Sequence, residues 1–355
     1  MTTRVVVIAD SRFPLREPFA GGMQSMTWHL VRGLRDRGVD VTVFAGHGTD
    51  ERLDARLLSV RPFTLSATAR MDVSMPPEEW LEQHHAYLQL MLGLAAEGRA
   101  DLVHNNSLHH LPVAMAAALP MPMLTTLHTP PTPWLESAVA LNSSVSSSYV
   151  AVSAHTANAW QHVVDAAVIH NGIDPRQWPV GPGGPDLVWF GRLVPEKAPH
   201  LALEIARLSG RRIRFAGPIT DQGYWATRLR PLLGPDVEYV GHLDQADLAR
   251  LVGASAACLV TPAWDEPYGL VAAEALSCGT PVLGFGRGGL PEVVAESCAR
   301  LVPAGEVEAA AALVETVTGL DRRAARTHAV EHCSLDSTLD AYLALYEKLS
   351  SGVAA

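Results

Sequence analysis

Two carboxylates flank the start of a predicted helix in the C-terminal third of the chain. Glu266 and Glu274 belong to the run Trp264-Asp265-Glu266-Pro267-Tyr268-Gly269-Leu270-Val271-Ala272-Ala273-Glu274. The spacing predicts Glu266 in the loop before the helix and Glu274 about two turns inside it, so both acids could meet one ligand at different depths. Between them, the free N–H groups of Gly269, Leu270 and Val271 can hold a diphosphate. The alternative for this run alone is an ordinary helix with acidic residues near its N-terminus, where the helix dipole favours negative charge.

A second candidate site is a turn with two cations that follows a predicted strand at residues 186–190. Its sequence is Gly191-Arg192-Leu193-Val194-Pro195-Glu196-Lys197. Because α/β folds bind ligands at the carboxyl ends of strands, Arg192 and Lys197 can converge there on a diphosphate that gains negative charge as it leaves. The chain has only two lysines, Lys197 and Lys348, so a lysine in this motif stands out. A solvated pair of surface charges is the alternative.

Two more candidates lie in the N-terminal half. Gly21 and Gly22 separate the first predicted strand from the first predicted helix, where glycine N–H groups can point into a ligand crevice. This loop lacks the full G-x-G-x-x-G pattern and no acid ends the next strand, which argues against a dinucleotide site and leaves a plain tight turn as the alternative. His128 follows the predicted strand Met123–Leu127 and could bond a ligand hydroxyl, although a structural role is common for one histidine among 15.

The elements that position these residues alternate between strands and helices. Strands are expected at residues 4–9, 41–45, 102–104, 123–127, 149–152 and 168–170, and again at 186–190, 212–216, 237–240, 257–260, 281–285 and 300–302. Their continuous apolar character implies burial on both faces, as in doubly wound parallel sheets. A stretch rich in proline and glycine at residues 175–185 indicates a hinge. We therefore expect an α/β fold with two Rossmann-like domains at residues 1–176 and 177–334.

Two further segments complete the description of the chain. The last segment, residues 335–355, is predicted as a helix that could pack back on the first domain. Residues 51–77 have no clear pattern and could border an acceptor pocket or form a surface insertion, while residues 78–97 have a helical pattern.

Composition excludes several classes of function. The 355 residues carry a formal charge of −10, which argues against a nucleic-acid partner. No apolar run approaches the ~20 residues of a membrane span, and the chain leads directly into a strand, so a cytoplasmic protein without integral membrane association is expected. The cysteines lack C-x-x-C spacing, and neither disulfides nor zinc are predicted for Cys258, Cys278, Cys298 and Cys333.

Taken together, these motifs resemble the retaining glycosyltransferases of family 4, whose GT-B fold has two Rossmann-like domains facing each other across a cleft. The resemblance spans nearly the whole chain, and its elements occur in order: Gly21-Gly22, His128, Val152-Ser153, Asn171-Gly172-Ile173-Asp174, Gly191-Arg192-Leu193 with Lys197, Tyr239-Val240-Gly241-His242, Glu266 with Glu274, and Gly288-Gly289-Leu290-Pro291-Glu292. One departure affects the acceptor side, because the family's glycine loop is often followed by an acid where this chain has Met23 and Gln24.

The resemblance assigns a role to each candidate residue. Glu274 would bind the ribose hydroxyls of a nucleoside-diphosphate sugar, Glu266 the transferred sugar, and Arg192 and Lys197 the diphosphate. The expected donor site is completed by Gly22, Gly191, Tyr268, Gly269, Leu270 and Val271. The acceptor side would comprise Gly21, Gly22 and His128, with His128 also placed among the catalytic residues beside Arg192, Lys197 and Glu266.

The expected activity is transfer of a sugar from the nucleotide-sugar donor to a small-molecule or glycan acceptor, with retention and by a front-face mechanism. No cofactor is expected, and no metal either, because no Asp-x-Asp motif occurs. Two alternatives remain open at this point: an epimerase of GT-B fold that acts on the nucleotide sugar alone, and a non-catalytic protein that binds nucleotide sugars.

Overall fold

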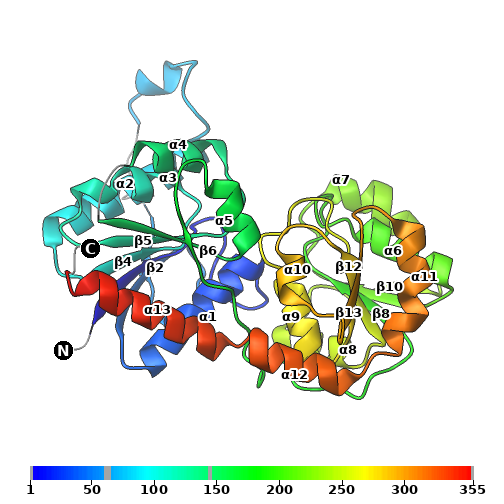
Figure 1. The fold of residues 1–355 in the computed structure, drawn as a ribbon. Helices are drawn as coiled ribbons and strands as arrows, with labels where there is room; N and C mark the ends of the chain where they lie inside the picture. Colours follow the sequence, from blue (N-terminus) through cyan, green and yellow to red (C-terminus); the bar gives the residue numbers. More distant parts are fainter. Residues whose placement is uncertain (1–2, 60–64, 143–145, 353–355) are drawn as a thin grey trace.

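Two parallel sheets, one in each half of the chain, form the centres of two domains (Figure 1). The computed structural model describes residues 3–59, 65–142 and 146–352. Within these residues the first sheet has the order β3-β2-β1-β4-β5-β6-β7 and the second the order β10-β9-β8-β11-β12-β13. Neighbouring strands pair in parallel, and helices pack on the sheets. The predicted α/β fold with two doubly wound, Rossmann-like sheets is confirmed.

The strands lie close to the segments that the sequence predicted. The first sheet contains β1 (Arg4–Ile8), β2 (Asp40–Ala45), β3 (Arg56–Leu57), β4 (Leu102–Asn105), β5 (Met123–Leu127), β6 (Ser147–Ala151) and β7 (Ala167–Val168). The second contains β8 (Leu187–Phe190), β9 (Ile213–Ala216), β10 (Val237–Tyr239), β11 (Ala257–Val260), β12 (Val282–Phe285) and β13 (Ala299–Val302). Among the strands of the described residues, only β3 had no predicted counterpart, because a two-residue edge strand with both residues exposed leaves no apolar pattern.

Helices connect successive strands, as parallel pairing requires. The helices of the first domain are α1 (Gly22–Asp36), α2 (Glu78–Glu97), α3 (His110–Ala114), α4 (Pro133–Leu141) and α5 (Ala154–Trp160). Those that follow are α6 (Pro199–Ser209), α7 (Gln222–Tyr224), α8 (Gln245–Gly253), α9 (Leu270–Ser277), α10 (Leu290–Val293), α11 (Val307–Thr318), α12 (Arg322–His332) and α13 (Leu335–Ser350). Among the described residues, none of the helices is both long and apolar enough to cross a membrane.

The last helix returns to the first domain, as the fold prediction allowed. In Figure 1, α12 lies under the second domain and α13 continues along the first. Two tyrosines of α13 reach the first sheet, where the Tyr346 hydroxyl lies 2.5 Å from His104 Nδ1 and the Tyr342 hydroxyl lies 3.1 Å from Thr126 Oγ1. Burial of His104 lowers its pKa to about 3, so this contact is made by a neutral imidazole.

Two segments of the chain cross side by side between the domains. Ile173 pairs with Ser334 in a parallel bridge, and the N–H of Leu335 donates to the Ile173 carbonyl at 2.9 Å. The stretch rich in proline and glycine that was predicted as a hinge makes backbone contacts with the second domain. The N–H of Gly181 donates to the carbonyl of Cys278, directly after α9, at 3.1 Å, and the N–H of Gly183 donates to the carbonyl of Gly253 in α8 at 2.9 Å. The bridge between Ile173 and Ser334 thus lies directly before the stretch rich in proline and glycine.

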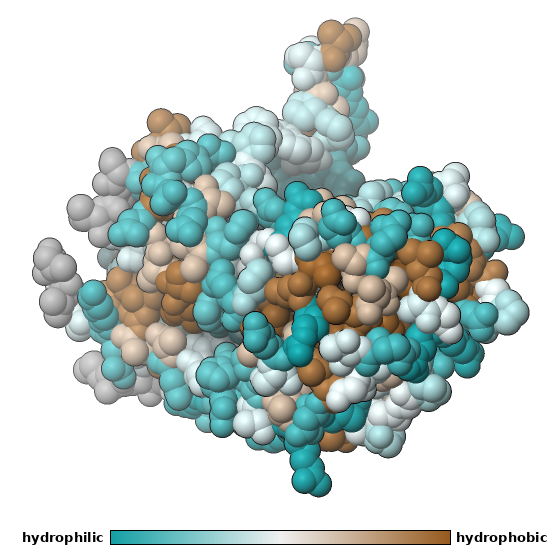
Figure 2. All heavy atoms as spheres, turned by 45° about the vertical axis from the view of Figure 1, so that its right-hand side comes forward, coloured by the Kyte–Doolittle hydropathy of each residue, from teal (hydrophilic) through white to brown (hydrophobic). Residues whose placement is uncertain are grey.

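A narrow segment projects from the first domain before α2 (Figure 1). It includes the 3-10 turn Ala69–Met71, and its tip bears hydrophobic side chains (Figure 2). Met71 is 78% exposed and Val73 is fully exposed. The segment belongs to the region without a readable pattern, of which residues 60–64, including Pro62, lie outside the described residues.

Candidate active site

A cavity of about 600 Å³ lies between the two domains, at the carboxyl ends of strands from both sheets. Ligand sites of open α/β sheets form at this edge. The cavity wall includes every residue that the sequence predicted for the site: Gly21, Gly22, His128, Gly191, Arg192, Lys197, Glu266, Tyr268, Gly269, Leu270, Val271 and Glu274. The structure therefore brings together residues that are more than 250 positions apart in the sequence.

The N-terminus of α9 opens into this cavity. Gly269 precedes the helix with a φ of 109°, a left-handed conformation that favours glycine. The helix therefore begins only at Leu270, and Glu274 lies about one turn inside it, not two turns as predicted from the sequence. The first N–H groups of any helix lack intrahelical partners, so those of Leu270 and Val271 are available to an anion in the cavity.

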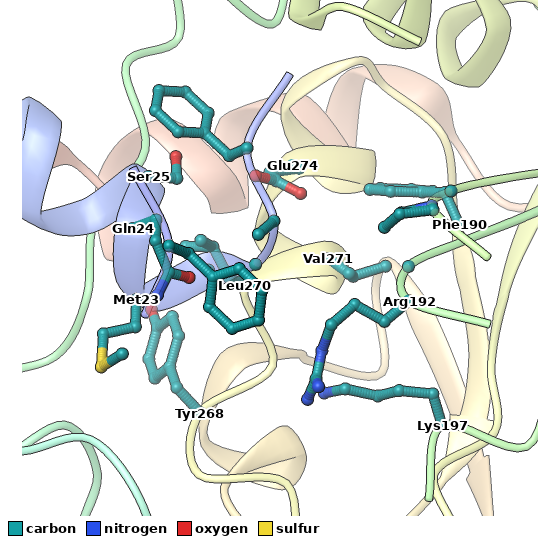
Figure 3. Close-up of a pocket in the computed structure, with 18 of the residues that line it drawn as sticks. Met23, Gln24, Ser25, Phe190, Arg192, Lys197, Tyr268, Leu270, Val271 and Glu274 are labelled. Carbon is teal, nitrogen blue, oxygen red and sulfur yellow. The ribbon is translucent and has the colours of Figure 1, made fainter. Parts of the chain in front are cut away.

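Glu274 faces the same cavity from the second turn of α9 (Figure 3). Its carboxyl group makes no hydrogen bond or ion pair with another side chain among the residues that the structure describes. Burial raises the pKa of Glu274 to about 8, because a carboxylate there loses hydration without gaining a cation. This group is consequently poised to hydrogen-bond a ligand.

Two glycines shape the loop that carries the cations. Gly191 follows β8 with a φ of 149°, and Gly217 follows β9 with a φ of 143°. A side chain on Gly217 would overlap the Gly191 carbonyl, so only glycine permits the close approach of these two strand ends. The turn then positions Arg192 and Lys197, whose side chains reach into the same part of the cavity in the view of Figure 3.

Lys197 and Glu266 form an ion pair at the cavity wall. Lys197 Nζ lies 2.5 Å from Glu266 Oε2 and 5.2 Å from the centre of the Trp264 ring. Trp264 Nε1 donates to the same carboxylate oxygen at 3.2 Å, while the N–H of Gly289 donates to the Glu266 carbonyl at 2.6 Å. Backbone and side-chain contacts therefore fix Glu266 beside a cation and an aromatic ring.

The first domain contributes a second helix N-terminus to the cavity. Helix α1 begins at Gly22, and a side chain at this position would come within 3.3 Å of the Leu270 side chain. Glycine thus lets the start of α1 approach the start of α9 across the domain boundary. Arg192 belongs to the same contact, because its Nε lies 4.0 Å from the position that a Cβ of Gly21 would occupy.

His128 is buried in the wall formed by the first domain, with 9% of its surface exposed. Its Nε2 donates to Asn106 Oδ1 at 2.9 Å. Burial lowers the pKa of His128 to about 4, although the nearby Asp10 carboxylate opposes this shift. The imidazole is therefore neutral at physiological pH, and it is a weak base.

Further residues of the wall were not predicted individually. They lie mainly at the ends of strands in the second domain and include Phe190, Gly217, Pro218, His242, Leu243 and Gln245. Phe190 and Gly217 could have been predicted, because each lies at the carboxyl end of a predicted strand, where α/β folds bind ligands. Gln245 begins α8, and no pattern in the sequence distinguishes it from other helix starts.

Glu292, which the sequence analysis named within the run Gly288-Gly289-Leu290-Pro291-Glu292, makes contacts between the domains that were not predicted. From α10 its carboxylate accepts hydrogen bonds from the N–H groups of Ala154 and His155 at 2.7 and 2.8 Å, and from His170 Nε2 at 3.0 Å. These N–H groups begin α5 of the first domain. Beside them, the Ser153 and Thr156 hydroxyls donate to the Pro267 carbonyl at 2.5 and 3.0 Å, so α5 is held directly against the loop that carries Glu266.

Metal-binding side chains are not gathered in the part of the chain that the structure describes. No group of three or more histidine, cysteine, aspartate or glutamate side chains there could hold a metal ion. The four cysteines are buried as free thiols.

Comparison with known sequences identifies both halves of the chain. Residues 20–177 match the family model described as Glycosyltransferase Family 4, and residues 173–328 match the one described as Glycosyl transferases group 1. Glycogen synthase of Mycobacterium tuberculosis is 28% identical over 86% of this chain and 85% of its own length. D-inositol 3-phosphate glycosyltransferase of Mycolicibacterium smegmatis is 28% identical over 98% of this chain and 92% of its own length.

Solved structures with the same architecture cover nearly the whole chain. AviGT4, a glycosyltransferase involved in avilamycin A biosynthesis, superposes with a TM-score of 0.72 at 22% identity over 99% of both chains. Anabaena HepE, solved in complex with UDP and glucose, gives a TM-score of 0.76 at 17% identity over 98% of this chain and 100% of its own. At these identities the likeness establishes the fold alone. With the two family matches, which together span residues 20–328, the chain belongs to glycosyltransferase family 4 and is a glycosyltransferase with the GT-B fold.

Proposed function

We propose that this enzyme transfers a sugar from a nucleoside-diphosphate donor to an acceptor hydroxyl with retention of configuration and without a metal. The observation that carries the proposal is the convergence of Arg192, Lys197 and the N-terminus of α9 on one cavity. A departing diphosphate gains negative charge, and preorganised cations and N–H groups stabilise that charge most strongly in the transition state. These groups supply the positive charge that a metal ion would otherwise provide.

The remaining donor contacts follow from the positions of the two glutamates. Glu274, close to the N-terminus of α9 and free of side-chain partners among the described residues, would accept hydrogen bonds from the ribose hydroxyls. Glu266 would accept hydrogen bonds from hydroxyls of the transferred sugar, since Lys197 and Trp264 already hold its carboxylate at the wall. The solved complexes of Anabaena HepE with UDP and with UDP-glucose support the class of donor proposed here.

The chemistry proposed is a front-face substitution. The bond between the anomeric carbon and the diphosphate oxygen breaks while the acceptor oxygen bonds to the same face of that carbon. The acceptor proton passes to a phosphate oxygen of the leaving group. His128 supports this route indirectly, because a buried imidazole with a pKa of about 4 is too weak a base to remove that proton efficiently near neutral pH.

The test begins with the donor. Thermal shift measured with UDP, GDP, ADP, dTDP and their common sugars identifies the nucleotide, since a ligand that binds only the native state raises the melting temperature. Donor hydrolysis and transfer are then measured with EDTA present throughout. Failure of every nucleotide to bind, or a requirement for added metal, would contradict the proposal.

Lys197→Ala is the decisive variant. We expect kcat to fall about 100-fold, the scale of losing one preorganised group that stabilises transition-state charge. The matched control is Lys348→Ala, which removes the other lysine of the chain from the exposed C-terminal end of α13 and should leave kcat unchanged. Equal rates in the two variants would remove Lys197 from the mechanism.

A further inference from the structure

A row of stacked rings adjoins the wall that the first domain gives to the cavity. Its members, which we call the aromatic row, are Trp134, His110, His109 and Tyr87. Successive ring centres are 5.3, 4.5 and 4.3 Å apart, with interplanar angles of 30°, 21° and 18°. The row joins α2, α3 and α4, which lie together on the first domain (Figure 1).

The inner end of the aromatic row is tied to the cavity. The Tyr87 hydroxyl accepts from the N–H of Ser11 at 3.0 Å and donates to the Ala9 carbonyl at 3.2 Å, directly before the cavity residues Arg12 and Phe13. Leu108 also lines the cavity, and the next residue in the chain is His109 of the aromatic row. A ligand that extends from the cavity along this wall would therefore meet the row.

The outer end of the row is open to solvent. Trp134 is 65% exposed at the start of α4, and a second tryptophan, Trp80, is 39% exposed and stacks on His84 with centres 4.9 Å apart. His84 in turn lies 5.4 Å from the His110 ring. Exposed tryptophans are typical of binding surfaces that need both an apolar face and hydrogen bonds.

Buried polar atoms without partners concentrate at the same place. Three of those found in the described part of the chain lie here: Asn106 Nδ2, Thr129 Oγ1 and His84 Nδ1. Asn106 and Thr129 follow the carboxyl ends of β4 and β5, and Asn106 is only 2% exposed. Of these residues, Thr129 also lines the cavity, so its hydroxyl is placed where a ligand in the cavity can supply a hydrogen-bond partner.

The charge of this wall is close to neutral. Arg12 Nε lies 3.0 Å from Asp10 Oδ1, so the cation that lines this side of the cavity is already paired. Burial, together with the repulsion between neighbouring imidazoles, lowers the pKa of His84, His109 and His110, and the value for His109 is about 3. A phosphorylated molecule would find no free cation in this set of side chains.

We propose that the acceptor is an uncharged saccharide or glycoside, whose ring packs on Trp134 and whose hydroxyls bond Thr129 in the cavity wall. The C–H groups of a pyranose present an apolar face to an aromatic ring, while its hydroxyls both donate and accept hydrogen bonds. This inference rests on the proposed transfer from a nucleotide sugar and specifies what receives the sugar. Binding and hydrolysis of the donor test that proposed function separately, because neither requires an acceptor.

The acceptor class is tested with paired compounds on the full-length enzyme and its identified donor. The probes are methyl and p-nitrophenyl glycosides of common hexoses and their oligosaccharides, each hexose also as its 6-phosphate, together with inositol and inositol 3-phosphate. We expect transfer to uncharged members, with at least tenfold lower kcat/KM for the phosphorylated partner. Preference for phosphorylated compounds, or transfer to no uncharged member by an enzyme that hydrolyses its donor, would overturn the proposal.

Variants locate the acceptor on this wall. Trp134→Ala should raise the KM for the acceptor about tenfold, near the upper range of an aromatic contact, with donor affinity and kcat little changed. Trp134→Phe should keep most of the affinity, and Leu141→Ala, which truncates an 81% exposed side chain at the other end of α4, is the matched control. An unchanged acceptor KM in Trp134→Ala would contradict the assignment.

Thr129→Val separates a ligand contact from a merely unsatisfied hydroxyl. The substitution keeps the shape and removes a buried oxygen without a partner, so the melting temperature should be equal or higher. If the acceptor uses this hydroxyl, its KM should nevertheless rise severalfold. An unchanged KM in a folded variant would exclude Thr129 from the acceptor site.

Discussion

Glu274 shows how one residue can be suited to a ligand at a cost to the free protein. Its carboxyl group lies in the cavity near the start of α9, where burial raises its pKa to about 8. In the unfolded chain the same group has an ordinary pKa near 4.5. Between these two values the folded protein binds more protons than the unfolded chain, so the free energy of unfolding falls as the pH rises through this range.

Glu274→Gln should remove this pH dependence. At pH 5 the side chain at position 274 is neutral in the folded wild type and in the variant, so the two proteins should melt at similar temperatures. By pH 8.5 the variant should melt a few degrees higher than the wild type, because it never has to bury a charge. Differential scanning calorimetry from pH 5 to 8.5 measures the difference, with the exposed Glu347→Gln as control. A difference that stays constant with pH would contradict the buried carboxyl.

The same substitution should weaken donor binding. Hydrogen bonds donated by ribose hydroxyls would stabilise the ionised form of Glu274, which can accept from two hydroxyls, whereas an amide has one oxygen to offer. We therefore expect Glu274→Gln to raise the Kd for the donor about tenfold. A variant that is more stable at high pH but binds less donor would show that the buried acid is retained for the ligand.

The residues around the cavity differ in how far the sequence could predict them. Glycines at strand ends and the Glu266/Glu274 pair could be found because short motifs place them at the carboxyl edge of a sheet. The Lys197–Glu266 ion pair and the burial of His128 depend on how distant segments pack, and local spacing carries no information about either. The start of α9 was misplaced because the left-handed Gly269 delays the helix beyond the first apolar residues.

At the scale of elements, the contact between α1 and α13 depends on one glycine. A Cβ on Gly33 of α1 would overlap the Leu339 side chain of α13. Apart from β3, strand positions could be predicted to within about two residues, because the central strands β4, β5, β8, β11 and β12 are continuous runs buried on both faces. The contact between α1 and α13 could not be predicted in this way, since it joins residues about 300 positions apart.

Alanine at two helical glycines should therefore have opposite effects on stability. Gly93→Ala in α2 meets no described atom within 4 Å and should raise the free energy of unfolding by about 0.5–1 kcal/mol, the helix preference for alanine. Gly33→Ala should lower it by about 1–3 kcal/mol, because overpacking against Leu339 outweighs the same preference. Urea unfolding measures both, and Leu339→Ala should recover part of the loss in Gly33→Ala. Equal effects at the two sites would show that α13 shifts to accommodate the added methyl group without a loss of stability.

At the scale of the whole molecule, the two domains meet through the backbone crossing at Ile173 and Ser334 and through side chains near the cavity. Glu292 is the charged member of the second group, bonded to the N-terminus of α5 and to His170. A carboxylate at a helix N-terminus is stabilised by the helix dipole as well as by the hydrogen bonds. Because α5 also contacts the loop before α9, this contact fixes the separation of the two cavity walls.

Glu292→Ala should loosen the domains without unfolding either of them, because water can replace the lost hydrogen bonds at the start of α5. We expect a larger radius of gyration in small-angle scattering and a loss of stability on the order of 1 kcal/mol, the usual value of a helix cap.

The contribution of Glu292 to the free energy of unfolding should depend on pH. Burial raises the pKa of Glu292, but the hydrogen bonds from α5 and His170 outweigh burial and lower it. The stabilisation by Glu292 is therefore present above the ordinary carboxyl pKa and is lost as the pH falls through the lower pKa of the folded state. The melting difference between wild type and variant should accordingly be constant from pH 6 to 8 and shrink below about pH 4. Glu296→Ala, four residues further along, is the control, and a scattering profile of Glu292→Ala that matches it would show that the backbone crossing alone sets the distance between the domains.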